Sequence, residues 1–242
     1  MKENHLEQLL RQPIRPRFPE NLTQIRTIAD GSSDLLVNEF FLSGLPAALL
    51  CCEGMLSTAM ITELILNPIT LKQPTAAKIF AYIRNRRLFS IDRAEAATYA
   101  DLFRFLNSGF AVLILEGADK ALVFGVQGYD KRSVSEPTGE NNIMGAKDGF
   151  IEVVRVNMSL LRRRMKSPQL KLELFVKGSK SQTDLCLCYM ADRVPKKLIQ
   201  RIKARLDTME LESILSSGYV QPFLENRRGC FFNTVGTTQR PD

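Results

Sequence analysis

Residues 134–166 read VSEPTGENNIMGAKDGFIEVVRVNMSLLRRRMK, and they contain a change from irregular to regular structure. The first part, residues 134–147, combines one proline, two glycines and two adjacent asparagines, which is typical of turns and loops. Asp148 is then predicted to cap a helix, and Ser167-Pro168 is predicted to end it. The stretch therefore predicts a crossing over residues 134–148 that separates two parts of the chain, followed by a helix.

The helix predicted after this crossing has one apolar face. Its members recur at helical spacing and are Phe150, Val153, Val154, Asn157, Leu160, Leu161 and Met165. Asn157 is the polar member, and a buried amide needs hydrogen-bond partners. We expect its amide to hold either the crossing or a ligand. The exposed face is predicted to carry Arg155, Ser159, Arg162 and Lys166. Because an exposed charge contributes under about 1 kcal/mol to folding, we expect Arg162 to matter for function more than for stability.

Short motifs in and after this stretch resemble one family. They are Ser135-Glu136-Pro137-Thr138, Gly145, Gly149-Phe150-Ile151-Glu152, Asn157, Leu161-Arg162-Arg163-Arg164, Ser216-Ser217-Gly218-Tyr219-Val220 and the closing Arg240-Pro241-Asp242. Together they are similar to the A subunit of the nutrient germinant receptors of bacterial spores, the GerA family. The resemblance is strong from Ser135 onward and looser before it. Met144 and Ala146 stand where the family usually has arginine and proline around Gly145, a departure that bears on any anion-binding role of this turn.

The resemblance implies a place in a longer protein. In the family, Arg-Pro-Asp is followed by a membrane-spanning region. The chain is therefore expected to be the soluble N-terminal domain of a protein in the spore inner membrane, on the cytoplasmic (spore core) side. The implied partners are the receptor B and C subunits and a small nutrient, an amino acid or a sugar, whose sensing triggers germination. The rival interpretation is an assembly scaffold, with the nutrient bound by other subunits. Homo-oligomerisation stays open.

Length and composition indicate an ordinary globular protein. The 242 residues are 45% hydrophobic and 24% charged, which is enough for a sizeable core. No run approaches the ~18 consecutive apolar residues that span a bilayer, and residues 1–17 lack the apolar segment of a signal peptide. With His5 as the single histidine, a metal site is not expected. Reduced thiols are predicted for all five cysteines, Cys51, Cys52, Cys186, Cys188 and Cys230.

The net charge of +7 is concentrated in the second half of the chain. Residues 1–133 carry 15 basic and 14 acidic side chains, whereas residues 134–242 carry 18 and 12. A basic half could meet nucleic acid, anionic lipid or an acidic partner, or could be a solvated surface without a partner. Nucleic-acid binding is the weaker interpretation, because the sequence shows no recognised motif and no aromatic residues interleaved with the charges. A membrane with anionic lipids fits better.

The remaining pattern predicts an α/β (α+β-like) fold with two small mixed α/β lobes, built on hairpins and helices and separated by a cleft. Hairpins are predicted at residues 35–52, 110–126 and 170–190, and helices at 21–29, 57–66, 75–87, 92–106 and 195–206. The predicted domains are an N-terminal arm at 1–19, a first lobe at 20–133, the crossing at 134–148 and a second lobe at 149–242.

The sequence does not predict an enzyme. It has no Ser-His-Asp or Cys-His pattern, no phosphate loop and no dinucleotide fingerprint, so neither catalytic residues nor a cofactor is expected. Small-molecule sites favour the boundary between lobes. The candidate ligand or inter-lobe residues are Glu136, Thr138, Arg155, Asn157, Arg162 and Arg163. The same residues could instead serve only to fix the lobes together.

Overall fold

A computed structural model describes residues 5–56, 74–85, 93–128, 148–225 and 232–241. The chain divides into two compact units, and the division falls within one helix. The first unit comprises Met1–Asp130 and Met158–Pro168, and the second comprises Lys131–Asn157 and Gln169–Asp242. Of the crossing predicted at 134–148, only Asp148 lies within the described residues. The helix predicted at 57–66 lies wholly outside them. Both units mix helices with antiparallel strands, as the predicted fold class requires.

The first unit is built on a five-stranded antiparallel sheet with the order β1-β2-β4-β5-β3. Its strands are β1 Leu35–Leu42, β2 Leu45–Cys52, β3 Arg93–Ala96, β4 Ala111–Leu115 and β5 Ala121–Phe124. The predicted β1-β2 hairpin is confirmed, with Leu42 opposite Leu45. Its two-residue turn, Ser43-Gly44, has positive φ at both positions (51° and 84°), as a tight hairpin requires. The predicted β4-β5 hairpin is also confirmed.

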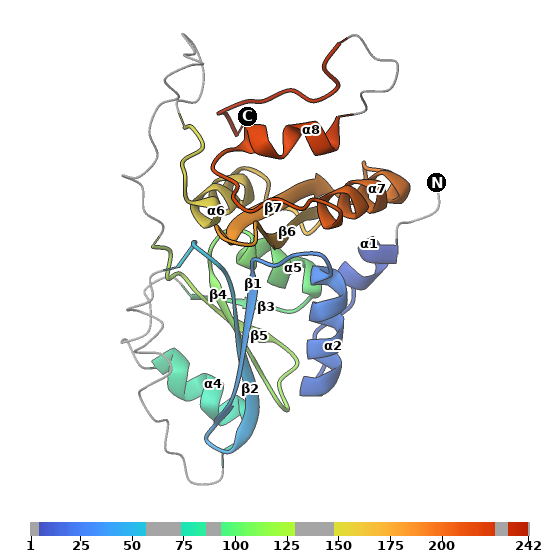
Figure 1. Cartoon of the computed structure of the whole chain (residues 1–242). Coiled ribbons are helices and arrows are strands. Elements are labelled where there is room, and N and C mark those ends of the chain that lie inside the picture. The colour runs from blue at the N-terminus through green and yellow to red at the C-terminus, as the bar shows by residue number, and fades with distance from the viewer. Residues whose placement is uncertain (1–4, 57–73, 86–92, 129–147, 226–231, 242) are drawn as a thin grey trace. The chain divides into compact units, whose positions relative to one another are not determined.

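Helices cover both faces of this sheet, which explains why every residue of β4 and β5 is buried. One apolar cluster joins alternate strand residues such as Leu50 and Ile114 to three helices, α1 His5–Leu10, α2 Phe18–Ala29 and α5 Tyr99–Leu106. The other cluster joins the intervening residues, such as Leu49 and Leu113, to α4 Ala76–Asn85. Figure 1 shows α2 and α4 on opposite sides of the sheet.

Two expectations for the first unit are corrected by this packing. The helix predicted at 92–106 begins only at Tyr99, where the Thr98 hydroxyl accepts a hydrogen bond from the Asp101 N–H, because residues 93–96 pair with β5 as β3. The proline-rich segment at 1–19 is not a loose arm where the structure describes it. Ile14 is 3% exposed and donates its N–H to the Ala97 carbonyl, and Phe18 also lies in the core.

The helix predicted after the crossing is shorter than expected, and it buries a different face from the predicted one. It is α6, Val154–Arg164, and its buried residues are Met158, Ser159, Leu160 and Arg162. Val153 and Met165 were predicted to face inward but are 53% and 44% exposed. The apolar pattern did not identify the buried face of α6, because one of the buried positions is occupied by an arginine, Arg162.

The second unit carries the third predicted hairpin, which is confirmed as β6 Leu170–Lys177 and β7 Thr183–Met190. Three helical segments follow: α7 Lys196–Asp207, the 3-10 turn η1 Ser217–Tyr219 and α8 Gln221–Leu224. A small apolar cluster of Leu206, Met209, Ile214 and Val220 joins them. Among the described helices of the chain, none is long and apolar enough to cross a membrane.

Candidate functional site

Four of the six predicted site residues lie in the part of the chain that the structure describes. Glu136 and Thr138 lie outside the described residues. The other four are on α6, where Arg155 is exposed, Asn157 and Arg163 are half-buried, and Arg162 is 2% exposed. The cavity beside Arg162 is lined by none of the other three.

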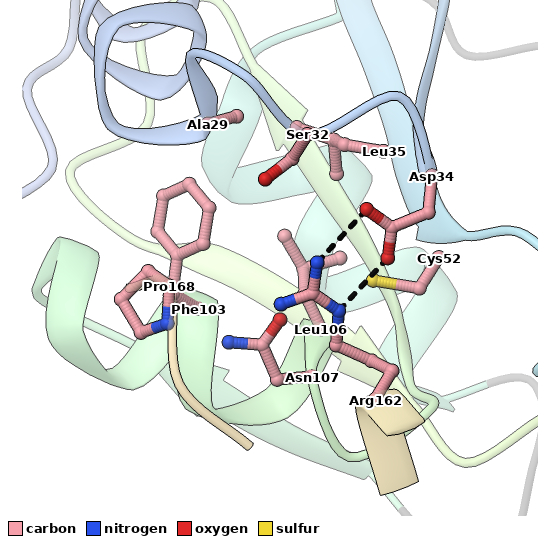
Figure 2. Close-up of a pocket in the computed structure, with 10 residues that line it drawn as sticks. All are labelled: Ala29, Ser32, Asp34, Leu35, Cys52, Phe103, Leu106, Asn107, Arg162 and Pro168. Carbon is pink, nitrogen blue, oxygen red and sulfur yellow. Dashed lines mark hydrogen bonds and ion pairs between the residues drawn. The ribbon is translucent and has the colours of Figure 1, made fainter. Parts of the chain in front are cut away.

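Arg162 forms a buried ion pair with Asp34 in the first unit (Figure 2). Its Nε donates to one Asp34 carboxylate oxygen at 2.8 Å, and its Nη2 donates to the other at 2.9 Å. Its Nη1 donates to the Ser167 carbonyl at 3.0 Å. This parallel, two-bond geometry is the strongest arrangement of guanidinium and carboxylate. The prediction that Arg162 lies on the exposed face is therefore wrong.

The local chain holds both partners in place. Asp34 follows α2 and precedes β1, and its carbonyl accepts the Glu53 N–H at 2.8 Å, which extends the β1-β2 hairpin by one bond. Arg162 lies in the last turn of α6, where a positive charge is favoured by the helix dipole. A buried charge pair is compatible with folding when its geometry is good and further hydrogen bonds satisfy it, and both conditions hold here.

The surroundings of this pair indicate a structural centre more than a ligand site. The cavity beside it measures about 10 Å³ and is walled by Phe103, Leu106, Asn107 and Cys52, among others (Figure 2). That volume suits about one water molecule, whereas small-molecule sites measure roughly 300–1,000 Å³. Burial raises the pKa of the Cys52 thiol to about 12. The Asp34 carboxylate also raises it, and Arg162 opposes the rise. The thiol is therefore protonated at neutral pH and is not a nucleophile.

The Asn157 amide has the hydrogen-bond partners that were expected for it, and both are backbone groups of Ile151, six positions before it. Its amide nitrogen donates to the Ile151 carbonyl at 2.6 Å, and its amide oxygen accepts the Ile151 N–H at 2.9 Å. Both residues belong to the second unit, and Ile151 lies just before α6 rather than in the 134–148 crossing. Asn157 thus closes the turn that leads into α6.

A larger cavity, of about 610 Å³, lies in the second unit. Its lining comes from β6, β7, α7, η1, α8 and residues 235–238. Leu187, Ile202 and Leu206 are among its apolar members, and Gln221 and Thr237 are among its polar ones. The residues that line it within the described ranges include no charged side chain. Its volume falls within the range of small-molecule sites.

Comparison with known proteins decides the family. The profile described as "Bacillus/Clostridium GerA spore germination protein" matches residues 23–242, nearly the whole chain. The chain belongs to the GerA family. The motifs that suggested this resemblance, from Ser135 to Asp242, all fall within the matched residues.

Individual relatives match most of the chain. The Uncharacterized membrane protein YfkQ of Bacillus subtilis is 30% identical over 95% of this chain and 45% of its own length. Spore germination protein KA of the same organism is 28% identical over 95% of this chain and 43% of its own length. The chain therefore spans less than half the length of these relatives. The crystal structure of the N-terminal domain of the A subunit of the Bacillus megaterium germinant receptor GerK3 is 25% identical, with a TM-score of 0.71 over 95% of this chain and 86% of that domain.

Asp34 is the site residue that the sequence did not reveal. It lies 128 positions from Arg162, in a Gly-Ser-Ser-Asp segment that reads as a solvated turn before β1. Arg162 itself was visible in the motif Leu161-Arg162-Arg163-Arg164, but no local pattern identifies a partner at that distance. The lining of the 610 Å³ cavity was likewise dispersed over residues 175–238.

Proposed function

We propose that this chain is the part of a spore germinant receptor A subunit that takes part in nutrient sensing, together with B and C subunits at the spore inner membrane. The proposed role is not catalytic. The observation that carries the proposal is the match to the GerK3 A-subunit domain over 86% of that domain. Relatives named spore germination proteins support it, because they match across most of this chain.

A germination assay tests this role. Spores whose gene lacks the codons for this chain should lose the response to the receptor's nutrient, measured as the fall in optical density, and should still germinate with a non-nutrient trigger. Restoring the codons should restore the response. An unchanged nutrient response in the deletion spores, with every related receptor gene also removed, would rule out the proposal.

Direct binding of the nutrient to this domain is the finer part of the proposal. The sequence placed that site between two lobes, at residues that include Glu136, Thr138, Asn157 and Arg162. Within the first unit, the cavity at Arg162 is about 30 to 100 times smaller than the usual range of ligand cavities. The 610 Å³ cavity of the second unit has sufficient volume. We therefore favour the second unit as the place where a nutrient contacts the described residues.

A titration separates binding from the alternative scaffold role. In NMR spectra of the 242-residue chain, a binding domain should show saturable shifts with candidate amino acids or sugars. Shifts at β7, α7 and α8 would place the nutrient in the second unit, and shifts at 134–165 would return it to the sequence-based site. The absence of saturable shifts at millimolar ligand would favour a scaffold, with the nutrient bound by other subunits.

A further inference from the structure

Among the described helices, α7 (KKLIQRIKARLD) has the largest number of charged residues, five basic and one acidic. Two of the basic residues have partners inside the second unit. Lys203 pairs with Glu173, and Arg205 donates to the Leu224 carbonyl. The other three, Lys196, Lys197 and Arg201, are exposed and form no ion pair with a residue that the structure describes.

These three cations share the outward side of α7. Lys197 and Arg201 are four positions apart and therefore lie on one face, and Lys196 flanks them. Lys196 and Lys197 occupy the first turn, where the helix dipole disfavours positive charge, and Pro195 supplies no side-chain cap there. The charges at this end thus do not serve the stability of the helix.

Apolar residues of α7 are also incompletely covered. Leu206 is the buried residue of the helix, whereas Ile199 and Ile202 are half-exposed and Leu198 is 37% exposed. Leu198 lies three positions before Arg201, so a leucine side chain stands beside the cationic face. A helix with a basic face and an incompletely buried apolar edge is typical of the interface between lipid headgroups and acyl chains.

We propose that the outward face of α7, centred on Lys197 and Arg201 with Lys196 at one edge and Leu198 at the other, binds an anionic lipid membrane. The cations would lie among the phosphate headgroups, and Leu198 would reach the acyl boundary. Nucleic acid suits this face less well, because single-stranded recognition uses aromatic stacking and the face carries no aromatic side chain. The surface goes beyond the proposed function, since it concerns lipid rather than nutrient.

Vesicle co-sedimentation of the 242-residue chain tests the surface. The chain should bind vesicles of phosphatidylglycerol and phosphatidylcholine in equal parts, and binding should weaken as salt rises. It should not bind pure phosphatidylcholine. A lysine or arginine near an anionic surface contributes about 1 kcal/mol, or about fivefold in partitioning. The triple variant Lys196→Gln, Lys197→Gln, Arg201→Gln should therefore bind on the order of 100-fold more weakly.

A matched control separates this face from net charge. Arg17→Gln, Arg26→Gln and Arg104→Gln remove three exposed cations of the first unit. This control should lose less than about fivefold, because each of these arginines already pairs with a carboxylate, of Glu20, Glu39 and Asp101 respectively. Leu198→Asn should weaken binding about threefold to tenfold without changing the salt dependence. Equal melting temperatures establish that the variants are folded.

Three results would overturn the proposal: equal binding to neutral vesicles, equal losses in the two triple variants, or tighter binding to duplex DNA or polyglutamate than to anionic vesicles. None of these measurements requires an assembled receptor. A negative vesicle result would therefore not contradict the proposed role in germination. A negative germination result would likewise not contradict lipid binding by α7.

Discussion

At the scale of single residues, the buried ion pair of Asp34 and Arg162 makes the first unit sensitive to loss of either partner. Arg162→Ala leaves the Asp34 carboxylate buried without its guanidinium, which costs about 3–5 kcal/mol in comparable cases. We expect that loss in the free energy of unfolding measured with urea. Arg164→Ala, at an exposed position of the same helix, should cost less than about 1 kcal/mol.

A double variant distinguishes the pair from either residue alone. Asp34→Leu with Arg162→Met should be more stable than either single variant, because neither charge is then stranded. Additive losses would contradict the coupling. The sequence alone predicted that loss of Arg162 would harm function and spare folding. The buried ion pair predicts instead that loss of Arg162 reduces the amount of folded protein.

Cys52 supplies a pH prediction at the same scale. The thiol pKa rises from 9.0 to about 12 on folding, with burial as the main cause. The stability that goes with the protonated thiol is fully present below pH 9 and is lost as pH rises toward 12, because the unfolded chain ionises first. Cys52→Ala should make the free energy of unfolding less dependent on pH above 9. An identical pH dependence in the variant would contradict this assignment.

At the scale of elements, the start of α5 shows tertiary structure overriding local pattern. Residues 93–96 read Arg-Ala-Glu-Ala, a helix-favouring sequence, yet they pair with β5 because the sheet offers an edge there. The helix therefore begins at its next good cap, Thr98.

The cap makes this boundary testable. Thr98→Ala removes the hydrogen bond from the Asp101 N–H and should cost about 1 kcal/mol of folding stability. Thr27→Ala, whose hydroxyl only donates to the carbonyl four residues before it within α2, is the matched control and should change stability by less than about 0.5 kcal/mol. Equal effects of the two substitutions would argue against a helix start at Tyr99.

At the scale of the whole molecule, the N-terminal segment belongs to the core of the first unit. Besides the buried Ile14 and Phe18, the Gly117 N–H donates to the Pro16 carbonyl at 2.7 Å. Limited proteolysis should therefore leave residues 5–19 and the strands at 45–52 and 111–124 uncut in the earliest fragments. An N-terminal arm, which the sequence alone predicted at 1–19, would instead be cut early. A first cut between residues 5 and 19 would contradict the packing.

The sequence by itself determined the three hairpins, the helices α2, α4 and α7, and membership of the GerA family. Alternating apolar residues, turn formers and caps act within about ten positions, so their effect can be read along the chain. Only the tertiary structure decided that β3 replaces the start of a helix, that residues 5–19 enter the core, and that Arg162 is buried. Each of these depends on a partner distant in sequence, and for Arg162 that partner lies 128 positions away. An isolated arginine is most stable in water, and only a carboxylate held by another element reverses that preference.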